Sequence, residues 1–171
     1  ATLRRQRQMC IRDSFHAMEL QIELSRRGMP FVITSGLRFF EQAHVKDLVA
    51  QLRFVINPKD RTAFYRFICL LPKVGEKTAA KLLKLTEKQA EESGQNIFKA
   101  FADPKVVLKV PADAKEDWVA VAETLQNINT LASSATPAQV VEGAICGWYQ
   151  DYLRRTYENW PRREEDLESL V

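Results

Sequence analysis

The sequence predicts a mainly α-helical fold with one short β-favouring segment near its start. After residue 42, apolar residues recur every three to four positions through most of the chain, as in helices that bury one face. Residues 30–34, Pro-Phe-Val-Ile-Thr, instead have the composition of a strand. With 171 residues, 46% of them hydrophobic, the chain suits one domain or one and a half. We therefore expect a helical bundle attached to a small αβ segment.

Composition argues against several classes of protein. No apolar run approaches the roughly 18 to 20 residues of a membrane span, and the arginine-rich start lacks the apolar centre of a signal peptide. Cys10, Cys69 and Cys146 are odd in number and far apart, which argues against a disulfide framework or a zinc site. His16 and His44 have no acid or cysteine at ligand spacing. We expect a cytoplasmic protein without membrane contact, without a metal site and with structural or surface histidines.

The net charge of +3 has an uneven origin. Residues 1–14 carry four arginines against one aspartate, so the rest of the chain is neutral overall. Within that rest, residues 53–88 hold nine Lys or Arg against three acids, whereas residues 142–171 hold seven acids against four arginines. This asymmetry makes the middle of the chain the better candidate for nucleic-acid binding.

The first expected elements are a helix, the strand and two further helices. The first helix covers residues 15–27 and stops at Gly28, which suits the backbone of a helix C-cap. A second helix begins near Gln42 and is broken at Pro58. Asp60 then caps the third helix. The predicted buried face of that helix consists of Phe64, Phe67, Ile68 and Leu71.

Capping signals divide the following part of the chain. Thr86 and Gln89 have the spacing of a capping box, so we expect a helix that starts there and ends at Gly94. Residues 106–108 precede a proline and are predicted to form a loop packed on the domain.

The last part of the chain is predicted to contain three helices. One begins at Asp113, one begins at Thr136-Pro137 and extends to Leu153, and an acidic one begins at Arg162. The buried face of the first is predicted to be Trp118, Val121, Leu125 and Ile128, and the solvated acids of the last are Glu164, Glu165, Asp166 and Glu168.

Residues 71–80 have the pattern of a helix-hairpin-helix, a motif that binds phosphate groups. Its turn, around Val74 and Gly75, leaves backbone N–H groups open at the start of the next helix, where the helix dipole also favours an anion. Such hairpins usually have a second glycine where this chain has Lys73, and a lysine there can make a charge contact instead. We take the turn from Lys73 to Thr78 as a candidate DNA-binding site.

Four lysines follow the turn at helical spacing. They are four, three and four residues apart and so form one stripe along a helix: Lys77, Lys81, Lys84 and Lys88. A stripe of lysines beside a phosphate-binding turn suits the backbone of duplex DNA. A merely solvated helix face is the alternative, and the neighbouring hairpin makes the DNA interpretation the favoured one.

A second candidate site lies where the predicted strand turns into the second helix. Gly36 permits a tight corner, Phe39 and Phe40 offer two aromatic planes, and Arg38 and Lys46 add positive charge. Such a corner can hold single-stranded DNA. Paired phenylalanines beside a strand are equally expected in a hydrophobic core, so these residues alone leave both interpretations open.

A longer ordered pattern begins in the second candidate site and continues to the hairpin. Gly-Leu-Arg-Phe-Phe-Glu from residue 36 is followed, after three residues, by Val-Lys-Asp-Leu, then by Leu-Arg-Phe-Val and Asn-Pro-Lys-Asp up to residue 60, and downstream by residues 71–79. This stretch resembles the region after motif IV of UvrD/Rep-type superfamily 1 DNA helicases. Trp-Tyr at residues 148–149 and Asp-Leu-Glu at residues 166–168 resemble the closing helices of the helical 2B insertion of that family.

The resemblance implies a fragment of an ATP-dependent DNA helicase. Residues 15–58 would belong to the second RecA-like domain, here an incomplete P-loop NTPase domain, and residues 59–171 to a 2B-like insertion that grips duplex DNA. ATP and Mg²⁺ would bind in the full-length protein, with the remaining helicase domains in cis, and Arg12 would reach the γ-phosphate. The chain has no Walker A sequence, so we expect no catalytic residue in this fragment and no ATP hydrolysis by it alone.

Residues 1–14 do not read like the rest of the chain. They resemble a translated sequencing adapter, and we interpret them as a non-native leader, which makes the match at Arg12 doubtful.

Two other functions remain open from the sequence. A stand-alone helix-hairpin-helix DNA-binding protein without ATPase activity would explain the basic middle but would leave the strand at residues 30–34 without a partner. A helical module of an AddA/RecB-like helicase-nuclease would explain the apolar helices but not the lysine stripe.

Overall fold

The structure is a computed structural model that describes residues 20, 22–29 and 39–171. The chain divides into two compact units, residues 1–42 and residues 43–171.

The described part of the first unit is helical. Residues 22–26 form a helix, and Gly28 has a φ of +64°. The N–H of Met29 donates to the carbonyl of Leu24 at 2.9 Å, so the helix ends at Gly28 as predicted. A short 3₁₀ helix, η1 (Phe39–Glu41), follows.

Helices and turns make up all of the structure that is described, which confirms the mainly α prediction. The predicted αβ piece of a RecA-like domain is not seen, because its strand at residues 30–34 lies outside the described residues. No helix in the described part is long and apolar enough to cross a membrane.

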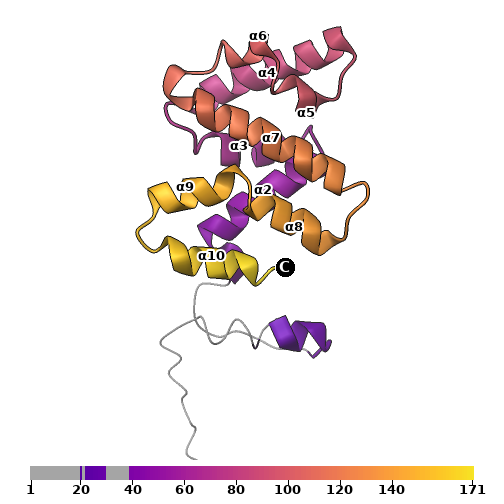
Figure 1. The fold of residues 1–171 in the computed structure, drawn as a ribbon, viewed down its shortest axis with the longest axis vertical. Helices are drawn as coiled ribbons and strands as arrows, with labels where there is room; N and C mark the ends of the chain where they lie inside the picture. Colours follow the sequence, from indigo (N-terminus) through magenta and orange to yellow (C-terminus); the bar gives the residue numbers. More distant parts are fainter. Residues whose placement is uncertain (1–19, 21, 30–38) are drawn as a thin grey trace, which may run out of the picture. The chain divides into compact units, whose positions relative to one another are not determined.

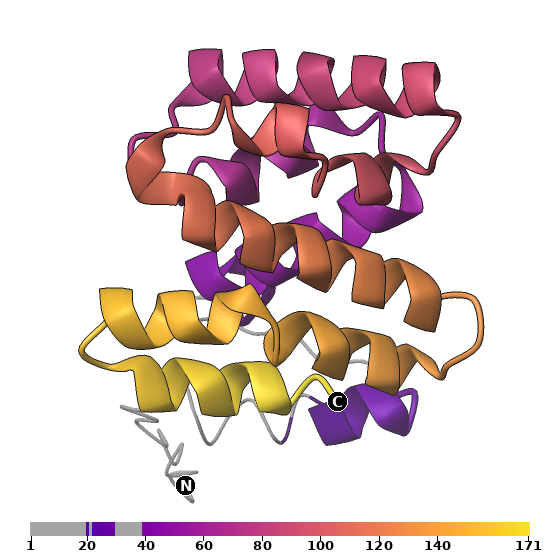
Figure 2. The same cartoon turned by 45° about the horizontal axis from the view of Figure 1, so that its top comes forward.

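The second unit is a succession of helices joined by short connections. In chain order these are α2 (Ala43–Ile56), α3 (Arg61–Ile68), α4 (Glu76–Ser93), α5 (Ile97–Ala100), α6 (Pro104–Val107), the 3₁₀ helix η2 (Ala112–Ala114), α7 (Lys115–Leu131), α8 (Pro137–Ile145), α9 (Trp148–Thr156) and α10 (Trp160–Glu168). Figures 1 and 2 show α4 at one end of this unit, α10 at the other and α7 between them. The two ends therefore present separate surfaces to solvent.

Helix boundaries in this unit follow the capping chemistry of the sequence. The Asp60 carboxylate accepts a hydrogen bond from the N–H of Ala63 at 3.0 Å and so caps α3 as predicted. Thr136 and Gln139 form a reciprocal capping box at the start of α8. Gly94, with a φ of +64°, ends α4 in the left-handed conformation that costs glycine little.

An aromatic core joins α2, α3, α5 and α7. Phe54 of α2 is central, and its ring centre is 5.2 to 6.0 Å from those of Phe64, Phe67, Phe98 and Phe101. Trp118 of α7 stacks on the Phe101 ring, and its indole N–H donates to the Phe101 carbonyl at 2.9 Å. The predicted buried faces of the third helix and of the helix after residue 113 are both confirmed. This core supports α3 and the hairpin turn that follows it.

Two predicted boundaries around α4 and α6 are wrong. Thr86 starts no helix, because α4 runs through it, and its buried hydroxyl donates to the Leu82 carbonyl at 2.9 Å. The predicted loop at residues 106–108 is partly helical, because Asp103 caps α6 by accepting from the N–H of Lys105 at 2.8 Å.

The single helix predicted from Pro137 to Leu153 is also wrong, since it breaks at Gly147 into α8 and α9. A Cβ atom on Gly147 would lie 2.4 Å from the side chain of Thr124, so only glycine fits this approach to α7. The Thr124 hydroxyl accepts the N–H of Trp148 at 3.1 Å and thereby satisfies a donor at the start of α9. The break follows from a contact with a distant helix, which local spacing does not reveal.

Candidate nucleic-acid interface

The predicted hairpin consists of α3, a turn and α4. In the turn, the N–H of Val74 donates to the carbonyl of Leu71 at 3.2 Å, and Pro72 and Lys73 stand between them. Lys73 has a φ of +57°, the only positive φ of a non-glycine residue among those described. Proline followed by a positive φ is the signature of a type II turn, which favours glycine at the second position. This explains why such hairpins usually have glycine where this chain has Lys73.

The turn opens directly onto the N-terminus of α4. Gly75 is the N-cap residue, has an extended backbone and makes no side-chain hydrogen bond to the first turn of the helix. A Cβ atom on Gly75 would meet nothing within 4 Å, so the space beside this exposed residue is open. The helix dipole favours an anion here, whereas the exposed carboxylate of Glu76 in the same turn opposes one.

The α4 lysine row, Lys77, Lys81, Lys84 and Lys88, is exposed, while Ala79, Leu82 and Leu83 are buried on the opposite face. Lys88 is 3.5 Å from Glu92. Within residues 39–171, no ion pair joins the other three lysines to an acid. The predicted stripe of lysines on one helix face is confirmed. Three of its ammonium groups have no acidic partner in the described structure, and they follow the N-terminus of the helix.

The other residues predicted in the hairpin have more restricted roles. Val74 is only 4% exposed and belongs to the core, so its side chain cannot contact a ligand. Thr78 is half-buried. Lys73 forms an ion pair with Asp113 of η2. The predicted charge contact of Lys73 is therefore already made within the protein.

The second candidate site is only partly described. Phe40 is 67% exposed, and Lys46 is exposed on α2. Gly36, Arg38 and the proposed γ-phosphate residue Arg12 lie outside the described residues, as does the Phe39 side chain. Phe40 and Lys46 belong to different units, so this predicted site stays a prediction.

A buried polar row on α2 was not predicted from the sequence. His44, Asp47 and Gln51 are spaced as one helical face and are 2%, 4% and 0% exposed. Asp47 binds Arg66 of α3 at 2.8 Å and accepts from the Tyr149 hydroxyl of α9 at 3.0 Å. Burial raises the pKa of Asp47, although Tyr149 and Arg66 act in the opposite direction. The row fixes α2 to its neighbours with directional contacts.

His44 lies between an acid and a base of α10. Its Nε2 is 3.1 Å from the Asp166 carboxylate, and its Nδ1 is 3.1 Å from a guanidinium nitrogen of Arg163. Because the guanidinium can only donate, Nδ1 accepts and the proton belongs on Nε2. Burial, and then the charge of Arg163, lower the pKa of His44 to about 4, and burial raises the pKa of Asp166. His44 is thus a neutral structural histidine at pH 7.

The prediction of a solvated acidic helix face is wrong at Asp166, which is 5% exposed and bound to His44. A signal was available: His44, Asp47 and Gln51 are polar residues at the spacing of a buried face, which calls for polar partners elsewhere. Their identity could not be read from the sequence, because Asp166 is distant along the chain.

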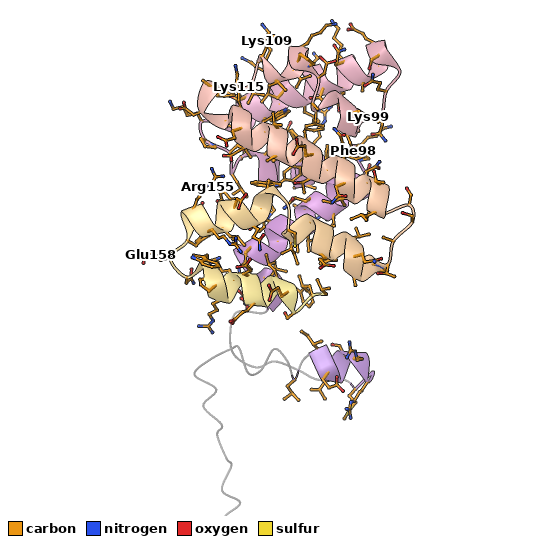
Figure 3. All side chains as sticks on the ribbon, in the orientation of Figure 1. Phe98, Lys99, Lys109, Lys115, Arg155 and Glu158 are labelled. Carbon is orange, nitrogen blue, oxygen red and sulfur yellow. The ribbon has the colours of Figure 1, made fainter. Side chains whose placement is uncertain are left out.

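The C-terminal arginines, Arg154, Arg155 and Arg163, are engaged within the protein. Arg154 binds Glu164 at 2.8 Å and lies 5.1 Å from the centre of the Trp160 ring, and Arg155 binds Asp117 at 2.6 Å. Arg163 adds a cation–π contact, with its guanidinium 3.9 Å from the centre of the Tyr157 ring. Figure 3 shows Arg155 on α9, away from Lys109 at the α4 end. These guanidinium groups hold helices together.

A groove of about 660 Å³ lies at the C-terminal end of α4, away from the hairpin. Its walls carry Lys59, Arg61, Glu87 and Glu91, so both signs of charge are present and neither sign of ligand is favoured. None of the predicted site residues lines it.

Comparison with known proteins decides the family. The model of the UvrD-like helicase C-terminal domain matches residues 4–135, more than half of the chain. The chain belongs to the UvrD-like helicase C-terminal domain family. This membership confirms the resemblance at that level: the chain is a region of a superfamily 1 UvrD/Rep-like DNA helicase.

Individual relatives agree with this assignment. The ATP-dependent DNA helicase Rep of Escherichia coli is 32% identical over 138 residues, 81% of this chain and 20% of Rep. Rep of Buchnera aphidicola from Baizongia pistaciae is 36% identical over 93 residues, 54% of this chain and 13% of that protein. DNA helicase II of Salmonella typhimurium is 24% identical over 162 residues, 94% of this chain and 22% of that protein. The chain thus spans about a fifth or less of these relatives.

Proposed function

We propose that this chain supplies DNA-binding surface to an ATP-dependent DNA helicase, and that the hairpin and the α4 lysine row bind the backbone of duplex DNA. The observation that carries the proposal is the position of three unpaired, exposed lysines directly after the open N-terminus of α4. Family membership supplies the partner, because the relatives are named as DNA helicases.

The row has suitable dimensions for a phosphate backbone. From Lys77 to Lys84 the helix rises by about 10 Å, at 1.5 Å per residue. Duplex DNA presents a phosphate about every 3.4 Å of helix axis on each strand, so the row can contact more than one phosphate. Ammonium groups bind phosphates without reading bases. The proposed binding is therefore independent of DNA sequence and sensitive to salt.

The remaining parts of the proposal follow the family. Residues 15–58 contribute to the second RecA-like domain, with Arg38, Phe39 and Phe40 near single-stranded DNA. Residues 59–171 form the 2B-like insertion. ATP and Mg²⁺ bind in the full-length protein, whose remaining domains are in cis, and the names of the relatives as ATP-dependent enzymes support this assignment. The fragment alone does not hydrolyse ATP.

Duplex binding by single lysine variants tests the proposal. Lys81→Ala is compared with Lys99→Ala, a matched control that removes another exposed lysine, on α5. Affinity for a short fluorescent duplex is measured across a series of salt concentrations. Lys81→Ala is expected to reduce the slope of log affinity against log salt by about 0.9, the value of one phosphate contact, and Lys99→Ala to leave it unchanged. Equal slopes for the two variants would refute the assignment.

A further inference from the structure

The ion pair between Lys73 and Asp113 places an acid beside the hairpin turn. The two side chains are 75% and 50% exposed, and Asp113 comes from η2, a distant part of the chain. Lys73 stands two positions before Gly75, the residue that opens the first turn of α4. A phosphate that arrives at this turn therefore meets an ammonium group whose charge is already matched by a carboxylate.

The pair can open at little cost. Both partners are in contact with solvent, so separating them exposes no buried charge. The Lys73 backbone is fixed by the turn, but its ammonium is carried on a flexible four-carbon chain and can change partners. A phosphate can therefore replace the carboxylate as the partner of Lys73.

Among the described residues, no other charged group at the turn forms an ion pair with Lys73. Glu76 is exposed in the first turn of α4 and repels an anion whether or not Asp113 is present. Among the described ion pairs, Asp113 is the acid that binds a residue of the turn. Its effect on a bound phosphate is twofold, because it repels the anion and also occupies Lys73.

We propose that Asp113 is an autoinhibitory counter-charge of the hairpin: it holds Lys73 in the free protein, and duplex DNA displaces it. This inference rests on the proposed function of α4 as a duplex-binding helix. It predicts that the chain binds duplex DNA more weakly than its hairpin lysines would allow without Asp113, because the ion pair must open before Lys73 can bind a phosphate.

The test compares four proteins: the unaltered chain, Asp113→Asn, Lys73→Gly and the double variant. Glycine is chosen at position 73 because it accepts the positive φ. Asp113→Asn is expected to tighten binding of a short fluorescent duplex by about five-fold, the size of one exposed ion pair. The slope of log affinity against log salt should change little, because Lys73 contacts a phosphate in both bound proteins. In the Lys73→Gly background, Asp113→Asn should tighten binding by clearly less, because no lysine at position 73 is left to release.

Glu142→Gln is the control, because it removes one exposed negative charge from α8, a helix separated from α4 in Figure 1, and should leave the affinity unchanged. Unaltered or weaker binding for Asp113→Asn would overturn the counter-charge, as would equal tightening without Lys73. If Asp113→Asn does not fold, Asp113→Ser is judged by the same outcomes. Failure of the unaltered chain to bind the duplex would instead refute the proposed function.

Discussion

The α4 lysine row and the C-terminal arginines are both basic, but they have opposite surroundings. Lys77, Lys81 and Lys84 are exposed and form no ion pair with an acid in the described structure. Each of the C-terminal arginines, Arg154, Arg155 and Arg163, is bound to a carboxylate, a histidine or an aromatic ring. The charge that a partner can use is therefore concentrated at the α4 end of the unit.

The difference follows from the chemistry of the two side chains as well as from their positions. A guanidinium is planar and can bind a carboxylate and an aromatic face together, so it suits contacts between helices. A lysine ammonium is strongly hydrated and stays in water unless a ligand of high charge density meets it. Counting basic residues along the sequence does not distinguish these roles, whereas the three-dimensional partners do.

The largest expected effect is the loss of folding stability on acidification. It arises at the end of the second unit that holds Arg163. The pKa of His44 is about 4 in the folded protein, against about 6.5 in an unfolded chain. The unfolded chain therefore binds the proton more readily, and stability is lost as the pH falls from about 6.5 towards 4, by about 3 kcal/mol in total. Chemical denaturation at about pH 7, 5.5 and 4.5 measures this loss.

His44→Asn is the control for that measurement, because asparagine offers a donor and an acceptor but does not titrate in this range. The raised pKa values of Asp47 and Asp166 act with the opposite sign, and both acids are present in both proteins. The same pH dependence in the two proteins would contradict a buried neutral His44.

Truncation of Arg163 is expected to have the next largest effect. Arg163→Ala removes the donor to His44 and the cation–π contact with Tyr157, at a cost of about 2 kcal/mol in the free energy of unfolding. Lys84→Ala, the matched change in the α4 lysine row, should alter that free energy by less than about 0.5 kcal/mol. Equal losses, measured by urea denaturation, would mean that the two groups of basic residues do not differ in structural role.

Lys73→Gly should stabilise the protein. The left-handed backbone costs a non-glycine residue roughly 1–2 kcal/mol, and an exposed ion pair returns at most about 1 kcal/mol. A gain of about 1 kcal/mol is therefore expected, whereas Lys81→Gly, inside α4, should lose about 1 kcal/mol. Thermal unfolding of the two variants gives the comparison, and a loss for Lys73→Gly would show that the Asp113 ion pair holds the turn together.

Local sequence patterns were sufficient for much of the α4 end. The cap at Asp60, the apolar face of α3, the C-cap at Gly94 and the exposed lysine row all depend on residues within one or two turns of each other. For the same reason the mainly helical fold was predicted correctly. The hairpin was recognised, but the ion pair that occupies Lys73 was not, since Asp113 is remote along the chain.

The C-terminal end was harder to predict because its structure depends on distant partners. The acids of α10 follow two arginines and outnumber its apolar residues, so the sequence suggested a solvated face, yet Asp166 is buried against His44 of α2. The break at Gly147 likewise depends on Thr124 of α7. Residues that meet only in the folded chain leave no periodic signal in either segment.

The most direct measurement is the salt dependence of duplex binding by Lys81→Ala and Arg155→Ala, each compared with the unaltered chain. Both changes remove one exposed basic side chain, but only Lys81 is unpaired. We predict that Lys81→Ala reduces the slope of log affinity against log salt by about 0.9 and that Arg155→Ala leaves it unchanged. An unchanged slope for Lys81→Ala, or an equal reduction for both variants, would contradict the assignment of the α4 lysine row as the duplex-binding surface.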